Sequence, residues 1–554
     1  MQFEYDAQGN PTAMTDPLGH AETYTYDDNG NLTQFVDRKG QVSQFTYDAM
    51  NRRIESGYAD GSSTTFTYDA VSRPIQVNDS ISGLTQMNYD NLDRLTQELT
   101  PQGTVSYGYD AVGRRASMSV NGLTPVTYQY DTATRLTQVA QGSRTVELGY
   151  DLAGRRNLLT YPNGTTTNYF YDNASRLIEI LHQGPSGIIE DLFYTYDAAG
   201  NRISFDRTSS QVNLPQEVQA AYNAANQQVQ FNTDTQTYDA NGNLTFDGTT
   251  TYTWDARNRL VQMSNGSLLA SFTYDALGRR ISKTINGSTI SYLYDGNDII
   301  AEIQNNTVTA TYLRGLNIDE PFLRSSAVAE YYHADALGSV LALTDQNGAV
   351  QTNYSYDPFG NTTIAGSSSN PFQYTGREND GTGAYYYRAR YYRPTLQRFN
   401  SEDPIRYLGG INFYSYVGNN PIIFIDPAGL LRFSWGVGGT LGLIDVNWNS
   451  SNPTKTTVSL VTPQLGGGFN FCLNANGSTS VDKPTGVNSQ DLQSNRGKPT
   501  LPVEAPLEEL PFTYSIGNRY LGLSFTDDLS SWCLNLGLAA GPLPVNVAVP
   551  LFSF

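Results

Sequence analysis

The sequence contains little of the chemistry that most enzymes use. It has two cysteines and three histidines among 554 residues. Cys472 and Cys533 both lie in the last quarter, so the chain is not a disulfide-rich scaffold; the two either pair after export or remain buried thiols. His20, His182 and His333 are too few and too scattered for a histidine-based metal site. We therefore predict neither a metal nor a cofactor.

Positive charge and apolar residues are also scarce. Lysine and arginine number 34 against 53 aspartates and glutamates, a net charge of −19, and only 39% of the residues are hydrophobic. An acidic surface disfavours nucleic-acid binding by the bulk of the chain. The low apolar content is typical of a single-layer sheet with one wetted face. No strongly apolar, charge-free run of 18 residues interrupts the first 430 positions, so we expect no membrane-spanning helix there.

A Tyr-Asp pair, in contrast, returns every 20 or 21 residues. So strict a period marks an array of one repeated supersecondary unit. The aspartates of the first series are Asp6, Asp27, Asp48, Asp69, Asp90, Asp110, Asp131, Asp151 and Asp172, and the pattern resumes at Asp197, Asp239, Asp255, Asp275, Asp295 and Asp357.

The unit reads aromatic-x-Tyr-Asp-x-x-Gly-Arg, as at Phe272–Arg279. Alternating aromatic residues place two rings on one face of a strand, Asp ends that strand, and Gly or Asn supplies the positive φ of a bulged hairpin turn. We interpret the repeat aspartates as turn formers and the 39 tyrosines as a packing ladder. The alternative is that the tyrosine rings bind sugars.

From about Ala327 the period gives way to a denser block. Its motifs are Tyr331–Ser339, Tyr356–Gly360, Phe372–Glu378, Tyr385–Tyr392, Arg398–Pro404, Asn412–Pro421 and Asp426–Leu430. This block resembles the RHS-repeat-associated core of bacterial Rhs proteins and of the C subunits of insecticidal Tc toxin complexes. The array before it resembles their YD repeats, which teneurins share.

The resemblance implies an all-β fold, in which a long antiparallel sheet spirals into a hollow, barrel-like shell capped by the associated core. It also implies aspartic-type self-cleavage after Leu430, at the Leu430–Leu431 bond, and a variable C-terminal segment held inside the shell. We therefore divide the chain into a YD-repeat shell at 1–326, the associated core at 327–430 and a variable segment at 431–554.

An aspartic mechanism needs two carboxylates close enough to share a proton. Asp403 and Asp426 are the candidates; each precedes a proline, which restricts the backbone before it. Spacing alone favours two plain Asp-Pro turns, and the family motif reverses this in favour of the dyad. Arg398, which matches the family arginine before the first Asp-Pro, either orients the dyad or forms a structural ion pair. Glu402 is a rival acid, weaker because no proline follows it.

Residues 431–554 have no Tyr-Asp period and no histidine. In the family this position holds an effector, often a toxin, so the resemblance gives its location and not its activity. An uncharged run at 529–554 suggests a membrane-active segment, but prolines within it favour buried strands. Arg432, Ser478–Ser480 and Glu508–Glu509 faintly resemble elements of ADP-ribosyltransferases, without the Glu-x-Glu spacing.

We predict a shell that encapsulates, cuts free and delivers a C-terminal effector to a target cell in bacterial competition or host attack. The alternative is a cell-surface adhesion or structural YD-repeat protein, with carbohydrate binding third. Met1 opens part-way through a repeat and no signal peptide is visible. We therefore expect secretion or surface display by a dedicated system, and an open N-terminal end completed by missing sequence or by a partner chain.

Overall fold

The computed structural model describes residues 1–208 and 217–430, together with the backbone of seven short strands after residue 430. One compact unit holds Met1–Val461, and the strands within Thr462–Pro544 form a second. Almost all regular structure is antiparallel β-sheet, as the sequence predicts. Among the described residues, no helix has the length and apolar character needed to cross a membrane.

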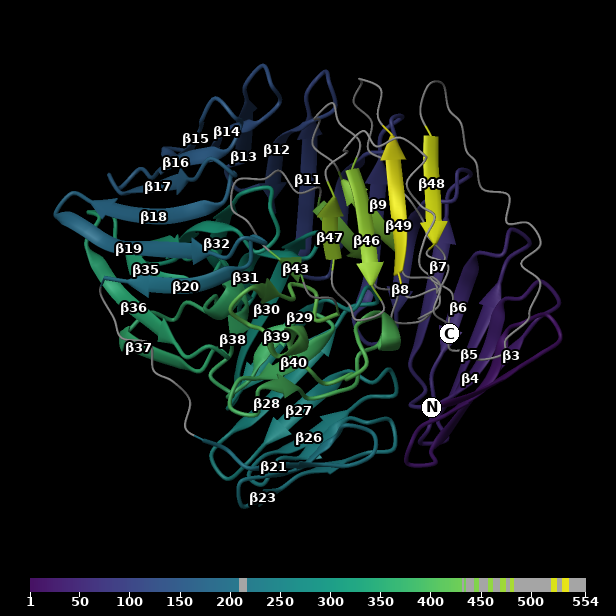
Figure 1. The fold of residues 1–554 in the computed structure, drawn as a ribbon. Helices are drawn as coiled ribbons and strands as arrows, with labels where there is room; N and C mark the ends of the chain where they lie inside the picture. The colour runs from purple at the N-terminus through teal and green to yellow at the C-terminus, as the bar shows by residue number, and fades with distance from the viewer. Residues whose placement is uncertain are drawn as a thin grey trace, which may run out of the picture. The chain divides into compact units, whose positions relative to one another are not determined.

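The first sheet is a meander of 20 strands, each paired with its neighbours in sequence (Figure 1). Its strands are β1 Gln2–Tyr5, β2 Pro11–Thr15, β3 Ala21–Tyr26, β4 Leu32–Val36, β5 Val42–Tyr47, β6 Arg53–Gly57, β7 Ser63–Tyr68, β8 Pro74–Asp79, β9 Gly83–Tyr89, β10 Leu95–Thr100, β11 Gly103–Tyr109, β12 Arg115–Val120, β13 Val126–Tyr130, β14 Leu136–Gln141, β15 Arg144–Tyr150, β16 Arg156–Thr160, β17 Thr166–Tyr171, β18 Leu177–Gly184, β19 Gly187–Tyr196 and β20 Arg202–Arg207.

A second meander of 14 strands follows. It contains β24 Thr237–Tyr238, β25 Leu244–Phe246, β26 Thr251–Trp254, β27 Leu260–Ser264, β28 Leu269–Tyr274, β29 Arg280–Ile285, β30 Ser288–Asp295, β31 Asp298–Gln304, β32 Thr307–Arg314, β33 Pro321–Ser325, β34 Ala329–Ala334, β35 Val340–Thr344, β36 Val350–Tyr356 and β37 Thr362–Gly366. The predicted boundary at 326/327 falls between β33 and β34, which pair directly in this sheet.

Smaller elements complete the described structure. They are a three-stranded sheet of β21 Ala220–Tyr222, β22 Gln228–Phe231 and β23 Asp234–Thr235; a four-stranded sheet of β38 Glu378–Asn379, β39 Tyr385–Tyr387, β40 Arg390–Arg393 and β41 Arg398–Phe399; the 3₁₀ turns η1 Tyr374–Gly376, η2 Arg406–Leu408 and η3 Val417–Asn419; and the pair β42 Phe424–Ile425 and β43 Phe433–Ser434. The later strands are β44 Leu443–Asn447, β45 Thr457–Val461, β46 Phe469–Asn474, β47 Thr479–Asp482, β48 Tyr520–Phe525 and β49 Ser531–Gly537.

The repeat unit folds as predicted, as the turn at Asp110 illustrates. Asp110 Oδ1 accepts the backbone N–H groups of Val112 and Arg114 at 3.0 and 2.9 Å, while Arg114 Nε donates to Asp110 Oδ2 at 2.7 Å. Gly113 has φ +90°, and the register shifts by a bulge just before the turn. The Asp110 carboxylate thus satisfies the backbone donors of its own turn, and the same bonds recur at Asp48 and Asp172, which confirms the structural interpretation at these positions. Asp295 instead bonds to Arg115 of the other sheet.

The tyrosines form a ladder that links successive units. The guanidinium carbon of Arg114 lies 4.4 Å from the ring centroid of Tyr130, the tyrosine of the next unit. The Tyr130 hydroxyl donates to the carbonyl oxygen of Arg115 at 2.8 Å. The same two contacts recur from unit to unit, for example at Arg94 and Tyr109. The rings are therefore engaged within the wall, as expected for a packing ladder.

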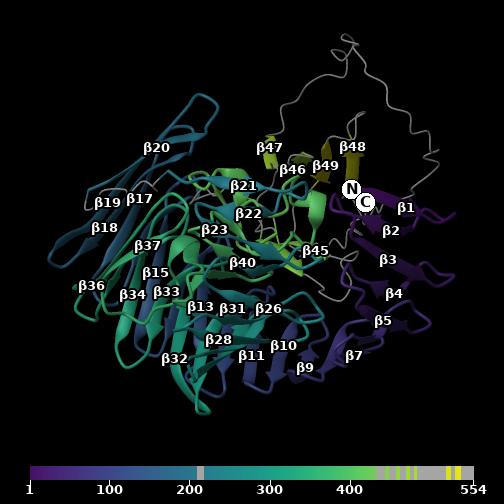
Figure 2. The same ribbon diagram turned by 90° about the horizontal axis from the view of Figure 1, so that it is seen from below.

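The two large sheets pack against each other through bonds between residues far apart in sequence. Five of these bonds connect residues 178 to 181 positions apart: Arg115 to Asp295, Glu98 to Arg279, Asp79 to Arg257, Arg144 to Ser325 and Asn163 to Thr344. Toward the end of the first sheet the separation falls to 152 positions for His182 and Ala334 and to 147 for Arg207 and Tyr354. A shared apolar core, which includes Val105, Val139, Leu313 and Leu323, fills the contact. Figure 1 shows β18 and β19 beside β35, Figure 2 shows them on the same side as β36, and their buried residues share an apolar cluster with Leu341 of β35. This arrangement is that of a spiralling sheet, and strand pairing among the described residues does not close it.

The C-terminal strands are described by their backbone register alone. β46 pairs with β49 so that Cys472 stands opposite Cys533. Whether the two thiols pair, and the suggested motifs at Ser478–Ser480 and Glu508–Glu509, lie outside what the structure describes for these residues.

Candidate active site

Two buried carboxylates lie at the two ends of the last segment of the associated core. Asp403 follows β41 and precedes η2, and Asp426 directly follows β42. Each is 3% exposed. The segment between them turns through η2 and η3, so residues 23 positions apart in sequence come close together.

Arg390 of β40 joins the two carboxylates. Its Nη2 lies 2.8 Å from Asp403 Oδ2 and 3.5 Å from Asp426 Oδ2. Its Nη1 donates to the carbonyl oxygen of Phe413 at 2.8 Å, and its guanidinium carbon lies 3.7 Å from the ring centroid of Phe399. The guanidinium is thus fixed by aromatic and backbone contacts, and both acids meet at one of its nitrogens.

Burial raises the pKa of Asp403 to about 7. Desolvation of the carboxylate is the largest cause; the charge of Arg390 opposes it, and the charge of Asp426 adds to it. Asp426 accepts the backbone N–H of Leu430 at its Oδ1, at 2.8 Å. The Leu430 N–H on one oxygen and Arg390 beside the other hold the Asp426 carboxylate in place. The two acids are therefore placed in different environments, the usual requirement for an acid and a base.

Residues 388–390 hold the loop that leads to Leu430. The Arg388 guanidinium donates to the carbonyl oxygen of Pro427. The backbone N–H of Ala389 donates to the carbonyl oxygen of Ala428 at 3.1 Å. Arg390 Nε donates to the carbonyl oxygen of Gly429. Three successive carbonyls are thus bound by three successive residues. The backbone of residues 427–429, which leads to Leu430, is therefore held in place.

The carbonyl of Leu430 lies beside Asp403. A Cβ placed on Gly409 would stand 2.2 Å from Asp403 Oδ2 and 2.9 Å from the Leu430 carbonyl oxygen. Both oxygens therefore crowd the same face of Gly409, where a larger residue would not fit. Leu430 is itself buried, at 2% exposed. Leu431, the predicted partner in the scissile bond, lies outside the described residues, in the connection between β42 and β43.

The contacts of the Arg398 side chain are to other described residues than the two carboxylates. Its Nη1 donates to the carbonyl oxygen of Asn226 at 2.9 Å, and its guanidinium lies over the ring of Tyr222. Arg390, and not Arg398, is the arginine that contacts the two carboxylates. The sequence reasoning missed Arg390 because it occurs in an aromatic strand, and no turn or proline marks it.

Glu402, the rival acid, is fully engaged elsewhere. Its two oxygens lie 3.0 and 2.5 Å from Nη1 and Nη2 of Arg38. A carboxylate held in a two-pronged ion pair is poorly suited to proton exchange, so Asp403 is the better candidate.

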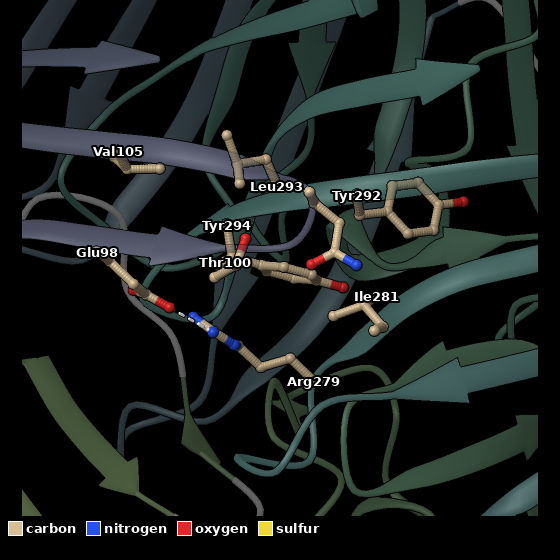
Figure 3. A pocket seen from close by; sticks show the side chains of 9 residues that line it. Glu98, Thr100, Val105, Arg279, Ile281, Tyr292, Leu293 and Tyr294 are labelled. Carbon is tan, nitrogen blue, oxygen red and sulfur yellow. Dashed lines mark hydrogen bonds and ion pairs between the residues drawn. The ribbon is translucent and has the colours of Figure 1, made fainter. Parts of the chain in front are cut away.

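The described residues contain no group of three or more His, Cys, Asp or Glu side chains that could hold a metal. A small cavity between the two sheets is lined by Glu98, Thr100, Arg279, Tyr292 and Tyr294 (Figure 3). Its two charged groups pair with each other at 2.5 Å, so they serve the packing of the sheets.

Comparisons with known proteins agree with this architecture. The Teneurin YD-shell family model matches residues 54–180 and 159–422, and the RHS Repeat model matches residues 5–36 and 26–63. The crystal structure of TcdB2-TccC3 is similar to this chain with a TM-score of 0.61 at 19% identity, over 77% of this chain and 29% of that one. A structure of TcdB2-TccC3 without the hypervariable C-terminal region gives a TM-score of 0.62 at 19% identity, over 77% of this chain and 28% of that one. At this identity the likeness concerns the fold alone.

Three curated relatives are similar in sequence. The tRNA nuclease WapA of Bacillus subtilis is 36% identical over 251 residues, which are 43% of this chain and 11% of the relative. The toxin subunit YenC1 of Yersinia entomophaga is 27% identical over 279 residues, 43% of this chain and 28% of the relative. The double-stranded DNA deaminase toxin A of Burkholderia cenocepacia is 26% identical over 296 residues, 45% and 19%. The matched part spans less than a third of each relative.

Proposed function

Because this chain belongs to the teneurin YD-shell family, we propose that it is the shell of a toxin-delivery protein. The wall encloses the segment after Leu430, and the associated core cuts that segment free at the Leu430–Leu431 bond. The names of the relatives, a nuclease, a deaminase toxin and a toxin subunit, support a toxin-related role. A hypervariable C-terminal region in TccC3 supports a variable cargo at this position.

The observation that carries the cleavage proposal is the position of Leu430. Its N–H is bound by Asp426, and its carbonyl oxygen lies beside Asp403, whose raised pKa lets it hold a proton near neutral pH. The bond after Leu430 therefore starts from a carbonyl group that is already oriented between an acid and a carboxylate.

The reaction is a hydrolysis by two acids. Asp426 accepts a proton from a water molecule as its oxygen attacks the Leu430 carbonyl carbon, and Asp403 gives its proton to the carbonyl oxygen. When the resulting gem-diol collapses, a hydroxyl proton returns to Asp403 and Asp426 passes its proton to the Leu431 nitrogen. The C–N bond breaks, leaving a carboxyl group on Leu430 and an amine on Leu431. Arg390, which contacts both carboxylates, holds them in place for this exchange.

The freed segment stays with the wall as a non-covalent cargo until delivery to a target cell outside the producing cell. The wall itself binds no nucleic acid, because its net charge is negative. Whatever activity the relatives' names describe belongs to those proteins; the effector activity of residues 431–554 lies beyond this proposal.

The test is expression of the full chain, 60.9 kDa, with variants of the dyad. The wild-type chain should give two fragments of roughly 47 and 13 kDa that co-purify under native conditions, with Leu431 as a new N-terminus. Asp403→Asn and Asp426→Asn should remain uncut, because an amide keeps the volume and cannot exchange the proton. Asp110→Asn, in a wall turn, should be cut like the wild type. A single uncut band in every chain would favour the adhesion alternative.

A further inference from the structure

The first repeats of the wall are bonded directly to the segment that carries Asp403. Arg38, in the turn after β4, forms its two-pronged pair with Glu402, the residue before Asp403. The side chains of Arg38 and Glu402 are 5% and 10% exposed. The two residues are 364 positions apart, about twice the offset between the large sheets.

A second ion pair holds the other side of the same segment. Arg406, three residues after Asp403, contacts Glu22 of β3, whose side chain is 3% exposed. The backbone N–H of Arg406 donates to the carbonyl oxygen of Asp403 at 2.9 Å, and Arg406 has φ +54°. A non-glycine residue in this conformation persists only where its surroundings hold it.

The two ion pairs belong to one cluster. Arg38 also lies 3.2 Å from Asp16 and 3.6 Å from Glu22. Its Nη2 donates to the carbonyl oxygen of Asn241 at 2.7 Å. The cluster thus brings together residues 16–38, Asn241 and residues 402–406. In sequence, Asp403 lies between two members of the cluster, Glu402 and Arg406.

We propose that Arg38 and Glu22 are positioning residues for Asp403, so that cleavage requires the first repeats to be docked on residues 402–406. This inference rests on the proposed function. A catalytic acid displaced by about 1 Å loses on the order of a hundred-fold in rate. The ion pairs touch no reacting atom, and they act by fixing both ends of the stretch that carries Asp403. Cleavage then reports that the N-terminal strands have assembled with the core.

The test follows cleavage of newly synthesised full-length chain over time. Arg38→Gln and Glu22→Gln should slow cleavage by about ten- to a hundred-fold. The pH profile of the residual rate should also shift, because a displaced Asp403 changes its distance from Arg390 and Asp426. The charge swap of Arg38→Glu with Glu402→Arg should recover part of the rate lost in Arg38→Gln. Arg114→Gln, which breaks a similar pair in the wall, should leave the rate unchanged.

Folding is checked by circular dichroism and the thermal midpoint. If Arg38→Gln fails to fold, Arg38→Lys keeps the charge without the two-pronged geometry and should still be slower. Folded variants of both Arg38 and Glu22 that cleave at the wild-type rate and with the wild-type pH profile would overturn this inference alone. A wild-type chain that never cleaves would overturn the proposed function and this inference with it.

Discussion

Gly429 stands so close to Tyr387 that a Cβ at position 429 would lie 2.2 Å from the Tyr387 carbonyl oxygen. Gly429 also has φ +69°, a conformation that side chains rarely adopt. The loop before Leu430 therefore packs backbone against backbone on the end of β39. Only glycine allows the carbonyl of Leu430 to reach Asp403 in this way.

Replacing Gly429 with alanine should strongly slow or abolish cleavage, because the loop must move off β39. The measurement is the fraction of cut chain on a denaturing gel over time. Gly113→Ala is the matched control: its φ is +90°, and its nearest neighbour is a side-chain nitrogen of Arg94 at 3.7 Å. It should carry the conformational strain, about 1 kcal/mol, and still be cut normally. Equal cleavage in both variants would argue against the observed loop geometry.

Cleavage should depend on pH through Asp403. Its pKa of about 7 means that the acid form is lost as the pH rises above neutrality, so the rate should fall on the alkaline side with a midpoint near 7. The rate of cutting is measured in buffers on either side of pH 7. A rate that continues to rise well above pH 7 would contradict the role of Asp403 as the acid.

The same titration has a consequence for stability. A carboxyl whose pKa is higher in the folded than in the unfolded protein contributes fully below its unfolded value of about 4, and this contribution is lost as the pH rises to about 7. Asp403→Asn removes the titration, so its thermal midpoint should rise relative to that of the wild type as the pH increases from 4 to 7. An unchanged difference across that range would show that Asp403 is not desolvated.

Equivalent repeat aspartates should differ in their contribution to stability. Asp275 is 4% exposed, and its partner Arg279 also pairs with Glu98 of the other sheet. Asp275→Ala leaves a buried arginine with one partner fewer and should cost about 3–5 kcal/mol. Asp110→Ala, in a more exposed copy of the same turn, should cost about 1 kcal/mol. Denaturant unfolding of both variants tests this, and equal losses would contradict it.

Two of the three histidines make the wall sensitive to acid. His182 of β18 and His333 of β34 pack ring against ring, with centroids 5.2 Å apart, where the two sheets meet. Burial lowers the pKa of His182 to about 4 and that of His333 well below its usual value. Thr167 and Thr344 hydrogen-bond to the two rings. A histidine whose pKa is lower in the folded than in the unfolded protein contributes to stability above its unfolded pKa of about 6.5. This contribution is lost as the pH falls toward 4.

The thermal midpoint should therefore decrease between pH 6.5 and 4, and less steeply in a chain with His182→Gln and His333→Gln. Glu190 and Arg207, which pair at 2.7 Å, are the charged groups nearest His182; Glu190 raises its pKa and Arg207 lowers it. His20→Gln is the control, because the His20 side chain is 39% exposed. The same acid slope in the double variant and the wild type would exclude the pair as its cause.

The wall could be predicted from the sequence because its bonds are local. Asp110 binds residues two and four positions on, and Tyr130 reaches back 15 positions, so one repeat contains the whole pattern. The dyad was within reach for a different reason: Asp403 and Asp426 each carry a following proline in a motif that the family shares.

Contacts over long distances in sequence could not be predicted. Arg390 lies among aromatic residues of a buried strand, where an arginine has no local signature, while Arg398 occupies the position that the motif suggested. The pair of Arg38 and Glu402 depends on how the sheet winds, and nothing in either neighbourhood reveals it. The predicted boundaries at 326 and 430 likewise follow sequence pattern, and the second meander crosses the first of them.

The offset of about 180 residues, at which part of the first large sheet is bonded to the second, has an evolutionary consequence. Contacts within a repeat survive the gain or loss of a whole unit, since every unit makes the same local bonds. The bonds between the sheets do not, because one deleted unit would separate Glu98 from Arg279 and Arg115 from Asp295 together. Whole repeats should therefore be gained by duplication or lost by deletion mainly outside the region where the two sheets are bonded to each other. The number of residues inside that region should change little during evolution.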